Sequence, residues 1–67
     1  MIYEFNNKVK SLVFLLEKIE AVSYDEENKK LELFLKSGNH TYFDFEDIED
    51  GKSCYNYLKD YLIETEY

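Results

Sequence analysis

Length, composition and charge already exclude several classes of protein: the 67 residues include one cysteine and one histidine, too few for an intramolecular disulfide or a Cys/His zinc cluster. They carry 15 acidic and 8 basic side chains, a formal net charge of −7 with lysine as the sole base, which argues against direct binding to DNA or RNA. The chain predicts one domain, residues 1–67, whose 18% aromatic content exceeds what so small a core can hide, so we expect a homodimer or a protein partner.

The first expected elements are a short strand and an amphipathic helix. Residues 2–5, "IYEF", are typical of a strand. In the stretch "NNKVKSLVFLLEKIE", apolar residues recur at i, i+3, i+4, i+7 and i+10 from Val9, which is the spacing of one helix face, and Asn6 or Asn7 can cap its start. A strand through residues 9–16 is the alternative, because periodicity alone does not type a short apolar run. We favour the helix.

Residues 21–46 predict a three-stranded antiparallel meander. The strand "AVSYD" is followed by the polar turn "EENK", in which Asn28 suits the left-handed backbone of a hairpin. The runs "KLELFLK" and "HTYFDF" alternate in polarity on either side of a second turn, Ser37–Asn39. One sheet face then carries Leu31, Leu33, Leu35, Thr41, Phe43 and Phe45. The other carries Glu32, Phe34, Lys36, His40, Tyr42 and Asp44.

The C-terminal segment predicts a helix that covers the apolar face of the meander. Its apolar side, at helical spacing, consists of Cys54, Tyr55, Leu58, Tyr61, Leu62 and Thr65. Asp47 or Asp50 can cap the first turn, and the nearby carboxylates suit the positive end of the helix dipole. The expected fold class is therefore α+β, a three-stranded antiparallel β-meander with an N-terminal and a C-terminal helix.

This order of segments resembles the KTSC domain. The matching stretches lie within residues 19–62 and read "IEAVSYDEENKKLELFLKSG", "YFDFEDI" and "YNYLKDYL". The chain lacks the family's proline before the helix and its glycine-aromatic segment after it, and it adds residues 1–18 in front. The resemblance implies a meander-plus-helix fold and no established catalytic motif. The RNA contact suggested for that family suits a basic protein better than this acidic one.

Five carboxylates crowd the segment "FDFEDIEDGK": Asp44, Glu46, Asp47, Glu49 and Asp50. An EF-hand alignment on Gly51 puts Ile48 and Tyr57 where oxygen ligands are required, so no calcium site is expected. The ending "GKS" lacks the earlier glycine of a phosphate loop, and acids there would repel a triphosphate. We predict neither metal nor cofactor. The cluster is either a solvated, helix-capping edge or an acidic patch that binds a basic protein.

Catalysis is not expected. His40 and Cys54 are the candidate base and nucleophile, but His40 points away from the predicted core. Cys54 shares a helix side with Leu58 and Leu62, where a thiol packs as a small hydrophobe. A carboxylate pair for acid–base chemistry needs a cleft, for which a domain of this length has little room.

Phe34 and Tyr42 lie in adjacent predicted strands, on the sheet face away from the C-terminal helix. The N-terminal helix, a second copy of the chain or a partner protein can cover them. Aromatic anchors ringed by acids are typical of interface hot spots. We therefore expect a non-enzymatic protein-binding module, in which these two aromatics and the five clustered carboxylates bind a basic, nucleic-acid-binding protein surface.

The composition is similar to that of small acidic phage or mobile-element inhibitors such as anti-CRISPR proteins. A KTSC-like nucleic-acid-binding module and a small structural homodimer are the alternative functions. The longest apolar run, Leu12–Leu16, is too short to span a membrane, and no basic segment opens a signal peptide. With the lone thiol, this predicts a cytoplasmic protein, in a bacterial host cell if the chain is phage-encoded.

Overall fold

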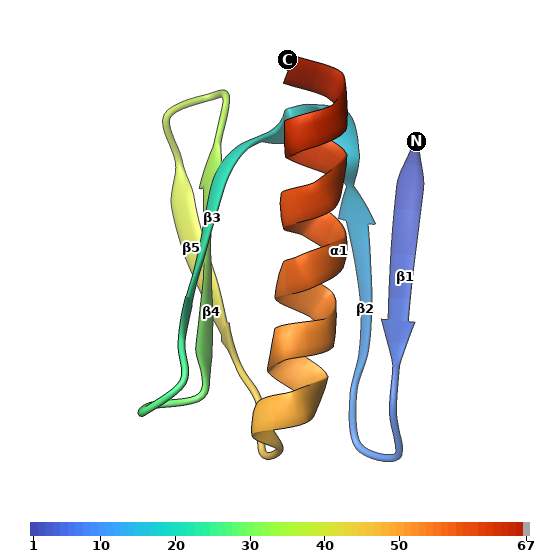
Figure 1. Ribbon diagram of the computed structural model, residues 1–67, viewed down its shortest axis with the longest axis vertical. Helices are drawn as coiled ribbons and strands as arrows, with labels where there is room; N and C mark the ends of the chain where they lie inside the picture. Colours follow the sequence, from blue (N-terminus) through green and yellow to red (C-terminus); the bar gives the residue numbers. More distant parts are fainter. Residues whose placement is uncertain (67) are drawn as a thin grey trace.

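The computed structural model, described for residues 1–66, is an α+β fold (Figure 1). Its elements are β1 (Ile2–Asn6), β2 (Ser11–Leu15), a short 3-10 helix (Leu16–Lys18), β3 (Ile19–Asp25), β4 (Lys30–Leu35), β5 (His40–Asp44) and α1 (Ile48–Glu66). Strands β1 and β2 form a two-stranded antiparallel sheet, and β3, β4 and β5 form a three-stranded antiparallel sheet in that order. The long helix α1 runs beside both sheets (Figure 1).

The predicted meander is confirmed as β3–β4–β5. The alternation of β4 holds, with Leu31 and Leu33 fully buried while Phe34 is exposed. The residue with left-handed backbone in the first turn is Lys29, with φ of 54°, and not Asn28 as predicted. Asn28 stabilises that turn through its side chain, which donates to the Asp25 carboxylate over 2.7 Å. The second turn places Gly38 at φ of 93°, where a residue without Cβ is favoured.

The predicted N-terminal helix is wrong, and the strand alternative for this segment is correct. Residues 11–15 pair with β1 in register from Ile2 opposite Leu15 to Asn6 opposite Ser11. Asn7 caps no helix. Its backbone N–H donates to the Lys10 carbonyl over 2.9 Å, and its side-chain oxygen accepts the N–H groups of Val9 and Lys10. This side-chain closure makes a tight hairpin turn at the point where the helix was expected to begin.

The hairpin also satisfies the hydrophobic pattern better than a helix would. Along β2 the side chains alternate, so that Phe14 is 4% exposed and its neighbours Val13 and Leu15 are 66% and 47% exposed. A helix with the expected face would have left Phe14 off that face. Its ring instead meets the Phe43 ring edge-on, with centroids 5.7 Å apart. A contact with a distant strand therefore decides the local structure.

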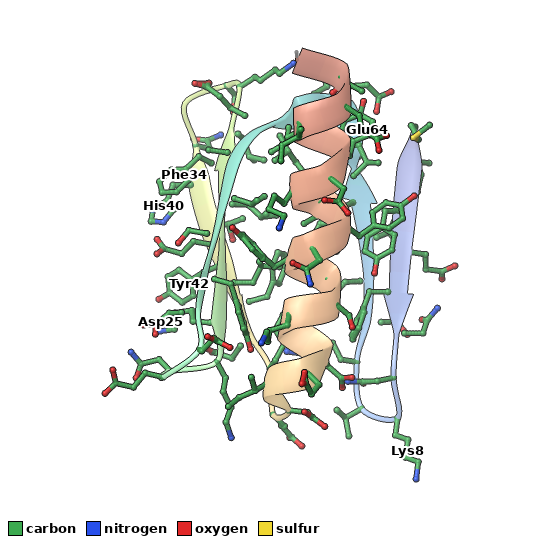
Figure 2. The ribbon with its side chains drawn as sticks, in the orientation of Figure 1. Lys8, Asp25, Phe34, His40, Tyr42 and Glu64 are labelled. Carbon is green, nitrogen blue, oxygen red and sulfur yellow. The ribbon has the colours of Figure 1, made fainter. Side chains whose placement is uncertain are left out.

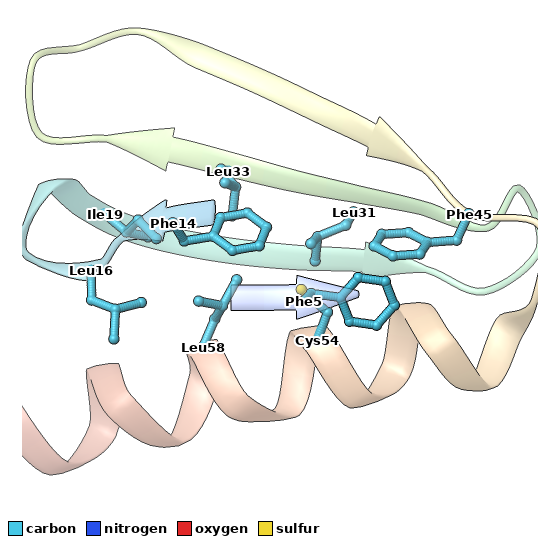
Figure 3. Packing of buried hydrophobic residues seen from close by; sticks show 9 residues of the cluster. All are labelled: Phe5, Phe14, Leu16, Ile19, Leu31, Leu33, Phe45, Cys54 and Leu58. Carbon is cyan, nitrogen blue, oxygen red and sulfur yellow. The ribbon is translucent and has the colours of Figure 1, made fainter. Parts of the chain in front are cut away.

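The core lies between the three-stranded sheet on one side and the helix with the hairpin on the other (Figure 3). Its buried members are Phe5, Phe14, Leu16, Ile19, Leu31, Leu33, Phe45, Cys54 and Leu58. Cys54 and Leu58 confirm the predicted inner side of α1, whereas Thr65, predicted on the same side, is exposed. The apolar sheet face is not covered by the helix alone, because Phe5 of the hairpin packs against Phe45 with ring centroids 5.4 Å apart.

The start of α1 distinguishes two acids that the sequence left equivalent. Asp47 is the cap, since its carboxylate accepts the backbone N–H of Glu49 over 2.8 Å. Asp50 instead accepts a hydrogen bond of 2.9 Å from the Asn7 side chain, which ties the helix to the hairpin turn. Removing the charge of Asp50 therefore disturbs a contact between two elements, whereas its exposed neighbour Glu49 has no such role.

Gly51 in α1 is expected to tolerate no side chain. A Cβ there would lie 2.3 Å from the Tyr24 hydroxyl oxygen, and that hydroxyl donates to the Ile48 carbonyl over 3.1 Å. Alanine improves helix propensity by about 1 kcal/mol, but displacing the ring costs about 1–3 kcal/mol. We expect Gly51→Ala to lower the free energy of unfolding, measured by urea titration. In a Tyr24→Ala background the same change should be neutral or stabilising, and an equal loss in both backgrounds would contradict the steric explanation.

Candidate partner-binding surface

The candidate surface is the outer face of the three-stranded sheet, which points away from α1. On β4 and β5 it carries Lys30, Glu32, Phe34, His40, Tyr42 and Asp44, and the β3 residues paired with this row are Ala21, Ser23 and Asp25. Figure 2 shows Phe34, His40 and Tyr42 projecting from the side of the sheet opposite the helix. Phe34 and Tyr42 remain 40% and 52% exposed. Cover by an N-terminal helix, which the sequence had suggested for these two rings, does not occur, because that segment is a hairpin packed on the other face.

Strand register arranges this outer face as a continuous aromatic strip. Phe34 lies directly opposite His40, and their rings stack with centroids 4.8 Å apart and planes 7° apart. The His40 ring is in turn 6.4 Å from the Tyr42 ring. The sequence predicted the two outer members of the strip and missed His40 as part of it. Its position on the same face was implied by the alternation of β5, and the stacking required the pairing of β4 with β5.

Charged groups flank the aromatic strip on both sides. His40 Nε2 is 2.6 Å from a carboxylate oxygen of Glu32. The Lys30 ammonium lies 4.4 Å from the Tyr42 ring centroid and 3.9 Å from the Asp44 carboxylate. These pairs are solvent-exposed, so each contributes little to stability. They place the carboxylates of Glu32 and Asp44 at the border of the strip.

The structure separates the five clustered carboxylates. Asp44 belongs to the outer face, and Glu46 and Asp47 are exposed in the connection between β5 and α1. Glu49 is exposed in the first turn of α1, and Asp50 of the same turn points toward the hairpin. Only Asp44 therefore shares the sheet face with the aromatic strip. The other exposed acids extend the negative surface around the end of the sheet.

The acidic end of the molecule, where Glu46, Asp47 and Glu49 lie, contains one more carboxylate that the sequence did not predict. Glu26, in the turn between β3 and β4, forms an ion pair of 3.2 Å with Lys52 of α1. Burial raises the pKa of the nearby Tyr24 phenol, and the charge of Glu26 raises it further, followed by those of the acids at the helix start. Lysines also reach this end, since Lys29 donates to the Glu46 carbonyl over 3.1 Å. The acidic end is therefore partly neutralised by the chain itself.

Cys54 and His40 do not form a catalytic pair. His40 is exposed on the outer face, while Cys54 is fully buried in the core between the helix and the sheets. Burial raises the pKa of the Cys54 thiol to about 12. The reactive thiolate is thus scarce at neutral pH.

We expect Cys54 to resist alkylation in the folded protein. Each pKa unit lowers the thiolate fraction about tenfold, so iodoacetamide at mildly alkaline pH should label the native chain roughly 1,000-fold more slowly than the chain in denaturant. Mass spectrometry of the quenched reaction measures both rates. Comparable rates in the two conditions would contradict the burial of this side chain.

Neither a metal cluster nor a spanning helix is found in the part of the chain that the structure describes. Among the side chains of residues 1–65, no three of the types His, Cys, Asp and Glu come together in an arrangement that could hold a metal ion. Over the same residues, no helix combines the length and the apolar character needed to cross a membrane.

Comparison with known proteins found no match: no family model fits the chain, and neither the curated proteins nor the solved structures contain a significant relative. The resemblance to the KTSC domain and the compositional likeness to anti-CRISPR inhibitors therefore rest on the residues quoted above and stay predictions.

Proposed function

We propose that the chain is a non-enzymatic protein-binding module that docks the outer face of its three-stranded sheet on a basic protein surface. The observation that carries the proposal is the exposed strip of Phe34, His40 and Tyr42. The hairpin and the helix both pack on the opposite face of the same sheet and leave this strip uncovered. Ordered aromatic rings with charged neighbours at their border are the usual centre of an interface.

The charge of the chain supports a basic partner. The net charge of −7 attracts positive surfaces over a long range and accelerates association with them. The carboxylates of Glu32 and Asp44 border the aromatic strip, and Glu46 and Glu49 continue the negative surface beyond it. Basic surfaces are common on nucleic-acid-binding proteins. By occupying such a surface the module would act as an inhibitor that mimics nucleic acid.

The acidic contribution is tested with Glu46→Gln plus Glu49→Gln, a pair that leaves the Asp47 cap and the Asp50 contact intact. We expect this variant to bind the partner about tenfold more weakly at low salt and with a smaller salt dependence, because exposed charges contribute up to about 1 kcal/mol each. Glu4→Gln plus Glu20→Gln makes the same charge change away from this end and serves as the control. Equal affinities for the two variants would limit the binding surface to the aromatic strip.

The partner for these measurements is obtained by affinity capture from a bacterial lysate with wild type and with a Phe34→Ala, Tyr42→Ala variant in parallel. A protein of high isoelectric point that the wild type retains and the variant loses supports the proposal. Release of that protein by an excess of DNA would support nucleic-acid mimicry. Identical captured sets with both baits would contradict docking through the outer face.

Two other functions predict different results with the purified chain. Aromatic rings on a sheet surface also stack on single-stranded bases, so a KTSC-like module would shift labelled RNA or DNA in a fluorescence anisotropy titration. A structural homodimer would sediment as a dimer with the outer face buried. We expect no anisotropy change with nucleic acid, because the net charge of −7 opposes the phosphates.

A further inference from the structure

We propose that a second site, a hollow on the C-terminal half of α1, binds an arginine side chain presented by a segment of another protein. The hollow has a volume of about 360 Å³ and is lined by Met1, Tyr57, Asp60, Tyr61, Glu64 and Thr65. Figure 2 shows Glu64 on the side of the helix away from the sheet that carries Phe34. The site is therefore distinct from the outer face, and binding at one does not require the other.

The hollow combines aromatic rings and carboxylates along one stripe of the helix. Tyr57, Asp60, Tyr61 and Glu64 follow one another at i, i+3, i+4 and i+7, which places them on the same side of α1. Tyr57 is 46% exposed, and its ring stacks on Tyr3 of the hairpin with centroids 4.0 Å apart and planes 13° apart. The hairpin thus holds one wall of the hollow in place before a ligand arrives, which reduces the entropy lost on binding.

The carboxylates of this hollow have no cation of their own. Among the side chains of residues 1–65, neither Asp60 nor Glu64 has an ion-pair partner. The adjacent Lys59 turns to Tyr55, with its ammonium 5.7 Å from the ring centroid. The N-terminal ammonium of Met1 is engaged by the Glu17 carboxylate at 2.5 Å. The hollow therefore presents two uncompensated negative charges beside two aromatic rings.

Arginine fits this combination better than other side chains. A guanidinium group stacks on the face of a tyrosine and donates two parallel hydrogen bonds to a carboxylate at its edge, whereas an ammonium group offers charge without that planar fork. Neutral or anionic groups would leave Asp60 and Glu64 without compensation. The chain itself contains no arginine, so a second copy cannot supply this side chain, and we assign it to a different protein.

The test is an NMR titration of the isotope-labelled chain with N-acetyl-arginine amide, in parallel with the lysine and citrulline counterparts. We expect saturable shifts confined to Met1 and residues 57–65, with arginine binding at least about tenfold more tightly than uncharged citrulline and more tightly than lysine. Equal binding of citrulline, or shifts spread over the outer face, would overturn the proposal. So would shifts of the same residues on dilution without probe, since these would show a second copy in the hollow.

Two variants distinguish the local effect of the Asp60 and Glu64 carboxylates from the effect of the net charge of the chain. Asp60→Asn plus Glu64→Gln is expected to weaken arginine binding at least about tenfold, because it leaves the aromatic walls and removes the paired charge. The control, Glu4→Gln plus Glu20→Gln, changes the net charge equally and should stay within about twofold of wild type. An equal loss of arginine affinity in the control would show that only the net charge of the chain matters, and this would overturn the proposed site. The Phe34→Ala, Tyr42→Ala variant should bind arginine as wild type does.

Discussion

Replacing Phe34 and Tyr42 together by alanine is expected to weaken partner binding at least about 100-fold. Truncating a central aromatic anchor typically costs about 2 kcal/mol or more, and the two rings stand at either end of one stacked strip. The fold should survive, because both side chains are substantially exposed at 40% and 52% and cross-strand pairs contribute only about 0.2–1 kcal/mol each. Isothermal titration with the captured partner measures the affinity, and urea unfolding measures the stability.

The control for this variant shortens two exposed apolar side chains on another part of the molecule. Val13 and Ile63 are 66% and 49% exposed and lie on the hairpin and the helix, away from the outer face. Alanine at both positions should leave the affinity within about twofold of wild type. If the two double variants bind equally well, the aromatic strip is not the interface. If the aromatic variant is itself unfolded in the urea titration, Phe34→Leu, which retains volume, replaces it.

Leu58→Ala is expected to leave the chain largely unfolded at physiological temperature. Leu58 is 1% exposed at the centre of the single core, where helix, hairpin and sheet meet. Deleting a buried leucine side chain costs about 2–5 kcal/mol, and a domain of this size has only about 3–5 kcal/mol of net stability. The expected loss is therefore comparable to the entire free energy of unfolding of the domain.

Circular dichroism and NMR peak dispersion measure that loss. Leu58→Met conserves volume and should remain folded, with a cost below about 1.5 kcal/mol. Ile63→Ala, at an exposed position of the same helix, should change stability by no more than about 0.5 kcal/mol. A native spectrum for Leu58→Ala with an unchanged urea midpoint would show that the helix is not essential to the core.

Local alternation in the sequence was sufficient to predict the meander. Leu31 and Leu33 alternate with Glu32 and Phe34, and a strand with one buried face admits only one assignment of its side chains to core and solvent. The position of Phe34 on the solvent face followed directly. The helical spacing of Cys54 and Leu58 was also sufficient to predict which side of α1 faces the core. Residues four positions apart lie on the same side of a helix, and both are buried.

The hairpin at the N-terminus could not be predicted in the same way. Residues 9–16 satisfy a helical and a strand pattern at once, and the choice depends on the contact of Phe14 with Phe43, far along the chain. The hollow on the C-terminal half of α1 also depends on contacts between segments that are far apart in the sequence. In the sequence Tyr57 is an ordinary exposed helix residue, and only the tertiary structure shows that Tyr3 of the hairpin stacks on its ring.

The sequence by itself determined the α+β class, the three-stranded meander, the inner side of the C-terminal helix and the negative charge, since these depend on periodicity and composition within single segments. Only the tertiary structure decided that the N-terminus is a hairpin, that His40 joins Phe34 and Tyr42 in one strip, and that the acidic cluster divides between the outer face, the helix cap and a contact with Asn7. The physical reason is that register, stacking and side-chain hydrogen bonds between distant segments arise only when the core brings those segments together.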